Sequence, residues 1–396
     1  MTTLHAGTLL SPEERLARRR LILRDALSLL TLFLITVVIF TLTLFLYRSF
    51  ENHREELWRR WKSRGEAALQ AGRPKDAVED LRSALAYIPD RQTEVELATA
   101  LADAGHTIEA TAYFNTLWES TPGDGQINLQ LARLAARVGN EPAAVLHYEA
   151  ALDGTWEGNG YDHRRQIRLE LAGYLISRRE YNQARSQLLV AASNAPDDPA
   201  IKIQIAALLE QAKDVQSALG IYRAVAARRP APVPAVEGAG RIAYSMGMFR
   251  VAADYLDRAS ASPDAAELPD AERAADRTML DISSRILLLF PAFDLPARER
   301  SQRILSAKNL AHQRLAGCAA ANSAAASQLA ALVTRWDQLP ARLTAAQLEQ
   351  QPDLEQTIVQ LAFDTESVTS RICGAPTGDD ALLLRIAANP IAVEQP

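Results

Sequence analysis

Residues 61–89 read WKSRGEAALQAGRPKDAVEDLRSALAYIP, and the spacing of small and large side chains in this stretch returns five more times along the 396-residue chain. Each copy has a central alanine, a second small residue twelve positions earlier and a large apolar residue four positions later. A period of about 34 residues is typical of a solenoid of helix pairs, so we predict an all-α fold. The central alanines, separated by 33, 34, 40, 34 and 34 residues, are Ala77, Ala110, Ala144, Ala184, Ala218 and Ala252.

The spacing has a physical explanation. Small residues let two antiparallel helices approach closely, and the large residue one turn later fills the space between them. Proline ends a helix, and glycine suits the turn from the first helix of a pair into the second. The one longer interval places six extra residues in a loop at 153–162. The prolines are Pro89, Pro122, Pro196 and Pro230, and the glycines are Gly72, Gly105, Gly139 and Gly247.

The repeated segment resembles the tetratricopeptide repeat family over about residues 58–265. The first repeat is the best match, and the later ones keep the small residues but lose the tryptophan. The resemblance implies a right-handed superhelix whose concave face, lined by the first helix of each pair, binds peptides or protein segments. The matching signature residues are Trp61, Gly65, Ala77, Leu81, Ala84 and Pro89.

The same resemblance implies which residues line the concave groove. Binding of a terminal carboxylate, as some members do, is disfavoured because Glu66 stands where asparagine is needed and Gln126 and Gln130 replace a basic pair. An extended or helical segment of a neighbouring protein is the expected ligand. The groove positions are Arg59, Lys62, Glu66, Val95, Thr99, Leu129, Arg133, Leu169, Gly173, Ile203, Ala207, Glu237, Arg241 and Tyr244.

Residues 26–47 carry no charged side chain and are long enough to cross a bilayer as a helix. A cleaved signal peptide has a shorter apolar region and a small-residue cleavage site, so we predict a retained signal anchor. Residues 1–25 form a short basic tail and residues 48–57 a helical connector. Since no glycine or proline occurs from Glu13 to Arg64, tail, span and first repeat helix are either one rod or joined by a hinge near residues 51–53.

The orientation prediction depends on basic residues. Arginines on the short tail before the span favour a cytoplasmic amino terminus, and long domains cross largely regardless of their charge. The arginines and lysine that follow the span nearly cancel this bias. We predict an extracytoplasmic carboxy-terminal part, periplasmic if the source is bacterial. The basic residues before the span are Arg15, Arg18, Arg19, Arg20 and Arg24.

Residues 266–396 fall outside the repeat register and are predicted to form a helical capping domain or a second binding domain. The pattern predicts helices at 271–290, from 297 to about 339 with Gly317 as a weak point, at 353–373, and a last one through Ala388. Cys318 lies twenty residues before position 338, and Cys373 lies twenty residues after Asp353, so two equal arms folded back at 339–352 would bring them together. We expect a disulfide in an oxidising compartment; two buried free thiols are the alternative.

Catalytic motifs are missing from the sequence. The six histidines are scattered, and no zinc-ligand spacing, phosphate-binding loop or nucleophile elbow occurs. The loop at 153–162 is acidic and rich in glycine but lacks the alternating ligands of a calcium loop. With a net charge of −5, no nucleic-acid partner is expected. No metal or cofactor is predicted.

The leading hypothesis is a non-enzymatic, membrane-anchored scaffold that binds protein or peptide partners of the membrane or envelope and contacts lipid through residues 26–47. One alternative is a ligand-binding or enzymatic carboxy-terminal domain. Another is an assembly factor that faces the cytoplasm, in which the cysteines would be reduced.

Overall fold

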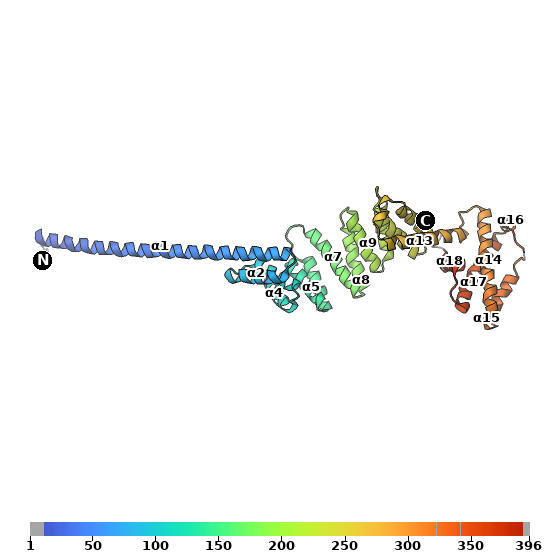
Figure 1. Ribbon diagram of the computed structural model, residues 1–396, viewed down its shortest axis with the longest axis horizontal. Coiled ribbons are helices and arrows are strands. Elements are labelled where there is room, and N and C mark those ends of the chain that lie inside the picture. Colours follow the sequence, from blue (N-terminus) through green and yellow to red (C-terminus); the bar gives the residue numbers. More distant parts are fainter. Residues whose placement is uncertain (1–11, 322, 341, 391–396) are drawn as a thin grey trace, which may run out of the picture. The chain divides into compact units, whose positions relative to one another are not determined.

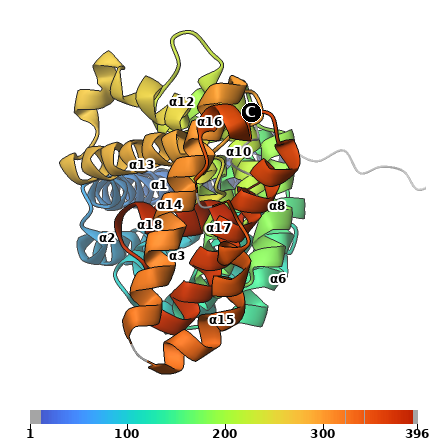
Figure 2. The same ribbon diagram turned by 90° about the vertical axis from the view of Figure 1, so that its right-hand side faces the viewer.

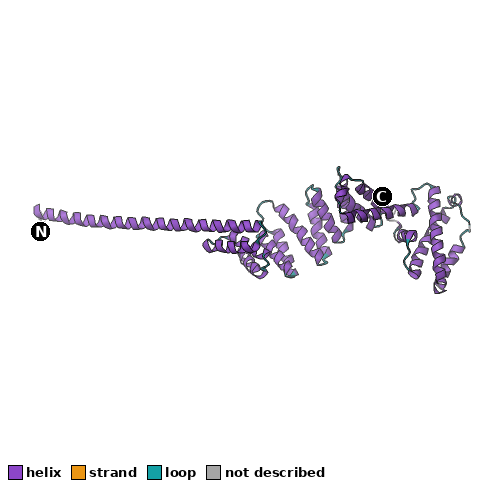
Figure 3. Cartoon of the chain, viewed as in Figure 1, coloured by secondary structure: helices purple, strands orange, loops and turns teal. Residues whose placement is uncertain are grey.

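The computed structural model describes residues 12–321, 323–340 and 342–390, and these form helices joined by short loops (Figures 1 and 3). The described residues contain no β-strand, only an isolated bridge between Asp124 and Thr155. The all-α prediction is therefore confirmed. Contacts divide the chain into two units, Met1–Arg164 and Arg165–Pro396. The first eleven residues of the predicted tail, and residues 322, 341 and 391–396 of the predicted carboxy-terminal domain, lie outside the described residues.

The first helix, α1, runs without interruption from Pro12 to Gln70 (Figure 1). It is one rod, without the hinge considered at residues 51–53. The side chains of the apolar stretch 26–47 are all exposed, and Phe45 keeps 70 % of its surface. The helix is long and apolar enough to span a membrane. Span, connector and first repeat helix are thus parts of a single secondary-structure element.

Six helix pairs follow the repeat register, which confirms the tetratricopeptide resemblance. The last part of α1 is the first helix of the first pair. A β-carbon at Gly65 would lie 2.6 Å from Cγ of Leu81, and one at Gly240 would lie 2.7 Å from Cγ of Leu256, so the small residues allow the close approach. The other helices of the pairs are α2 (Pro74–Tyr87), α3 (Arg91–Asp103), α4 (Thr107–Ser120), α5 (Gly125–Arg137), α6 (Glu141–Asp153), α7 (Gly160–Ser177), α8 (Tyr181–Ser193), α9 (Pro199–Gln211), α10 (Val215–Ala226), α11 (Val233–Ser245) and α12 (Phe249–Ser260).

The turn inside each pair has a residue with positive φ at the same register position. Four of these are the predicted glycines, but the fourth and fifth pairs use Arg179 (φ 66°) and Lys213 (φ 64°). L-residues with a side chain adopt this conformation at a cost of roughly 1–2 kcal/mol. The sequence pattern alone did not reveal these two turns, because the residue type that normally marks them is absent.

Beyond the repeats, the prediction of one long helix over 297–339 is wrong. Two helices cover that range, and the second folds back along the first, since Trp336 packs 5.3 Å from His312 between ring centroids. The reversal buries Leu329 and Trp336 in the carboxy-terminal core, which a straight helix would leave in solvent. The elements are η1 (Pro263–Glu267), α13 (Asp270–Leu289), α14 (Ala297–Ala321), α15 (Ser323–Asp337), α16 (Ala345–Leu348), α17 (Pro352–Cys373) and α18 (Gly378–Ala388).

Helices α14 and α17 lie side by side and run parallel (Figure 2). Arg300 donates to Glu355 at 2.9 Å, and Cys318 is joined to Cys373, so both pairs have the same separation of 55 residues. The sulfur atoms meet because of this parallel register. The equal-arm argument from sequence placed the cysteines on the two arms of one hairpin, whereas Cys318 belongs to the helix before it.

Candidate functional site

The first unit contains a hollow of about 570 Å³ on the face formed by the first helices of its pairs. This volume is within the range of sites that hold a small ligand or a short chain segment. Its walls come from α3, α5, the loop before α7 and the start of α7. The lining residues are Arg91, Gln92, Val95, Asp124, Gln126, Ile127, Leu129, Gln130, Arg133, Thr155, Trp156, Glu157 and His163.

The six-residue insertion forms one wall of this hollow. The Trp156 indole nitrogen donates to the carbonyl of Ala151 at 2.8 Å, and its ring stacks on His163 with 4.6 Å between centroids. Gly125 admits the ring, because a β-carbon there would lie 2.3 Å from the indole nitrogen. The Gly125 amide also donates to the Thr155 carbonyl at 3.0 Å. The loop is therefore fixed against α5, a role that sequence reasoning missed when it treated the loop as a plain insertion.

One pair of opposite charges inside the hollow is compensated within the fold. Arg91 donates to Asp124 at 3.0 Å, and Asp124 also accepts from the backbone amides of Gln126 and Ile127 as the amino-terminal cap of α5. The walls offer a ligand apolar surface, the amide groups of Gln126 and Gln130, and the side chains of Arg133 and Glu157. Amide side chains both donate and accept, so they can pair with the backbone of an extended chain.

One predicted groove residue on α1, Lys62, belongs to an ion cluster with Asp90 and Glu96. The Lys62 ammonium lies 3.5 Å from Asp90 and 3.8 Å from Glu96. Burial alone would raise the pKa of Asp90. Hydrogen bonds donated by Thr93 and the positive charge of Lys62 have the larger combined effect, so the pKa of Asp90 is lowered. For Glu96, burial dominates over Lys62 and raises the pKa. Lys62 is thus engaged within the fold.

The remaining predicted groove residues of the first unit differ in accessibility. Val95, Leu129 and Arg133 line the hollow. Thr99 lies one turn along from Val95 and donates its hydroxyl to the Val95 carbonyl at 2.8 Å. Two others lie on α1, where Arg59 is exposed and paired with Glu55 and Glu66 is half-buried.

In the second unit, the predicted residues on α7, α9 and α11 include a charged cluster. Arg241 is paired with Glu210 and lies 3.3 Å from Glu237. Burial raises the pKa of the Glu237 carboxyl, and the charge of Arg241 only partly offsets it. Leu169, Ile203 and Ala207 are half-buried. Gly173 faces open space, since a β-carbon there would meet nothing within 4 Å.

Tyr244 has a different environment from the open groove position expected. The guanidinium of Arg385 on α18 lies 4.3 Å from its ring centroid, and the Phe249 ring packs edge-on at 5.8 Å. In this geometry Tyr244 connects the last repeat to α18.

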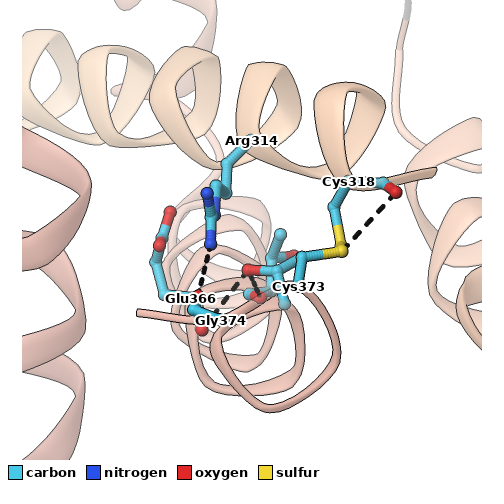
Figure 4. The surroundings of a disulfide bond; sticks show 7 residues. Arg314, Cys318, Glu366, Cys373 and Gly374 are labelled. Atoms are coloured by element: carbon cyan, nitrogen blue, oxygen red, sulfur yellow. Dashed lines mark hydrogen bonds between the residues drawn. A yellow bond between two sulfur atoms is a disulfide. The ribbon is translucent and has the colours of Figure 1, made fainter. Parts of the chain in front are cut away.

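The carboxy-terminal helices hold the disulfide and a buried carboxylate (Figure 4). The α-carbons of Cys318 and Cys373 are 5.8 Å apart, and Arg314 donates to the Gly374 carbonyl at 2.7 Å. Glu366 is fully buried, and neither carboxylate oxygen has a hydrogen-bond partner among the described residues. Burial, together with the charge of Asp380, raises the pKa of Glu366 to about 7.

Among the described residues, no group of three histidine, cysteine, aspartate or glutamate side chains could hold a metal ion. The arrangement suits binding of a protein segment.

No protein-family model and no curated protein matches the chain. Similar solved structures include PilF of Pseudomonas aeruginosa, with 16 % identity, a TM-score of 0.40 and coverage of 57 % of this chain and 99 % of that one. PilW, a type IV pilus biogenesis factor, has 14 % identity, a TM-score of 0.40 and coverage of 55 % and 97 %. YrrB, a tetratricopeptide protein with an unusual peptide-binding site, has 18 % identity, a TM-score of 0.38 and coverage of 51 % and 100 %. Likeness at this level does not assign a function.

Proposed function

We propose that this tetratricopeptide-like chain is a membrane-anchored scaffold that binds a segment of a partner protein in the hollow between α3, α5 and the loop at 153–162. The observation that carries the proposal is α1, which is at once the apolar span and the first helix of the repeats. The hollow adds a surface of suitable volume, with amide and apolar groups and a fixed aromatic wall. The chemistry of its lining favours binding over catalysis.

We further propose that the repeats and the carboxy-terminal helices lie outside the cytoplasm. Two observations support this orientation: the arginines on the short tail before the span, and the paired cysteines, since disulfides persist in oxidising compartments. Protease added to intact spheroplasts should degrade the carboxy-terminal part. If that part resists digestion until the cells are lysed, the orientation is reversed and the cytoplasmic assembly factor is the better reading.

A second candidate function concerns the carboxy-terminal helices. They enclose a hollow of about 510 Å³ with mainly apolar walls, which include Phe290, Ile304, Val359 and Phe363. A ligand-binding role for this region, the alternative drawn from sequence, rests on that hollow. Protection of α17 from hydrogen exchange by a bound apolar compound would favour it.

The scaffold proposal is tested with two alanine substitutions in the wall, Gln126→Ala and Gln130→Ala, made together. Tagged protein is purified from crosslinked, detergent-solubilised membranes, and recovered proteins are quantified. Asn115→Ala on α4, an exposed amide on a second helix, is the matched control. A partner recovered with the wild type and the control but reduced at least tenfold with the double variant supports the proposal. Equal recovery with all three proteins contradicts the assignment of the hollow. Lys62 is unsuitable for this test because it is paired with two carboxylates.

A further inference from the structure

The unbroken α1 sets the height of the hollow above the membrane. Tyr47 ends the charge-free stretch, and Lys62 follows fifteen residues later on the same helix. At 1.5 Å per residue, Lys62 is about 22 Å beyond the apolar span when the helix stands upright, and about 21 Å with a typical tilt. Neither glycine nor proline interrupts this stretch, so the distance cannot adjust by bending at a breaker.

Ion pairs tie the hollow to the level of Lys62. The Lys62 ammonium lies 3.5 Å from Asp90, the cap of α3. The next residue, Arg91, reaches Asp124, the cap of α5, at 3.0 Å. Both Arg91 and Asp124 line the hollow. The amino-terminal ends of α3 and α5, which form its rim, are therefore held close to the level of Lys62, about 20 Å from the bilayer core.

We propose that the occupant of the hollow is an extended juxtamembrane segment of another protein embedded in the same membrane. The inference rests on the proposed docking function and names the class of partner. An extended chain rises about 3.3 Å per residue, so about 7 residues cover the height. With some slack, the bound segment lies about 5–15 residues from the end of the partner's own span.

Two features favour this occupant over a soluble partner. A rigid rod fixes the height of the hollow, and a fixed height matters for a ligand whose own height is set by the same bilayer. Because both proteins are confined to the same membrane, the segment also has a higher effective concentration near the hollow than a protein free in solution would have. The amide groups of Gln126 and Gln130 suit an extended chain whose backbone groups are unpaired.

The test changes the height of the hollow above the membrane and measures which part of the partner protein occupies it. A photo-reactive phenylalanine analogue replaces Glu157, an exposed residue of the lining, in the full-length protein in its native membrane, and the crosslinked partner peptide is mapped by mass spectrometry. A helix-forming heptad inserted between Arg48 and Ser49 raises the hollow by about 10 Å and rotates it by only about 20°. The same heptad inserted between Arg19 and Arg20, on the other side of the span, leaves the height unchanged and is the matched control.

We expect the crosslinked peptide within about 15 residues of a membrane span in the partner. The heptad after Arg48 should move the crosslink about three residues farther from that span, whereas the control insertion should not move it. A crosslink to a protein without a span, or one that stays in place after the insertion, overturns the inference but leaves the docking function standing. If probes at Glu157 and at Gln92, both exposed in the lining, yield no protein crosslink in the protein without an inserted heptad, the docking function itself fails.

Discussion

The buried carboxylate of Glu366 makes the stability of the carboxy-terminal helices depend on pH. Its pKa rises from 4.5 to about 7 on folding, chiefly because burial removes it from water, with a contribution from Asp380 that Arg314 partly offsets. Below pH 4.5 the group is protonated in both states and has no effect. Between pH 4.5 and 7 the folded state holds a proton that the unfolded state has released, so stability falls as pH rises. Above pH 7 the loss is complete, at about 3 kcal/mol.

Glu366→Gln removes this titration while keeping the shape of the side chain. At pH 8 the variant should exceed the wild type in the free energy of opening of α17 by up to about 3 kcal/mol, and at pH 4.5 the two should be equal within about 0.5 kcal/mol. Asp337→Asn is the control, since it removes one negative charge from an exposed position at the end of α15.

Hydrogen exchange of the full-length protein in detergent, followed by mass spectrometry, measures the opening of α17 locally. Rates are corrected for the intrinsic dependence of exchange on pH. The reasoning is refuted if α17 in the wild type is as protected at pH 8 as at pH 5, or if Asp337→Asn changes the pH dependence as much as Glu366→Gln does. Either result would mean that Glu366 is not the group whose burial limits stability at neutral pH.

Three further predictions concern stability. Lys213→Gly should raise the melting temperature through about 1 kcal/mol of relieved strain, because the turn holds this residue at positive φ. Gly240→Ala should lower stability by about 1–2 kcal/mol through overpacking against its neighbouring helix, while Gly173→Ala, with open space around it, should raise stability by up to about 1 kcal/mol; urea unfolding compares the two. Reduction of the disulfide between Cys318 and Cys373 should cost the carboxy-terminal helices about 4 kcal/mol, the loop-closure value for 55 residues, as read from their exchange rates with and without reductant.

The repeat architecture could be predicted because its determinants are local and periodic. A small residue such as Gly65 and a large one such as Leu81 lie sixteen positions apart in one helix pair, and the same pair of requirements returns in each repeat. For α1 the sequence left two possibilities, one continuous helix or a hinge near residues 51–53. The absence of glycine and proline permits a continuous helix but does not require one.

The hollow and the reversal after α14 could not be predicted, because both depend on contacts between distant residues. Trp156 becomes a wall only because Gly125, thirty-one positions earlier, leaves room for its ring. The composition of 297–339 favours helix throughout, and the chain reverses because Leu329 and Trp336 gain burial against other helices. The sequence predicts a helix at 353–373 but does not mark Glu366 within it as a buried residue, although the packing of α17 leaves its side chain no exposed surface.

The disulfide and the buried carboxylate act on the same helix in opposite directions and on different states. The bond between Cys318 and Cys373 raises the free energy of the unfolded chain, whereas ionised Glu366 raises that of the folded one. Their effects should therefore add. The oxidised protein can tolerate the ionised carboxylate at pH 8. The reduced protein at pH 8 lacks the stabilisation by the disulfide and is also destabilised by ionised Glu366. Its free energy of unfolding is then lower by about 7 kcal/mol, a large part of the stability of a typical domain. In the reduced protein we expect α17 to be open to a larger fraction at pH 8 than at pH 5, with the same free-energy difference of about 3 kcal/mol between the two pH values as in the oxidised protein, and we expect Glu366→Gln to abolish that difference. Equal opening of the reduced wild type at both pH values would show that the two features do not share one cooperative unit.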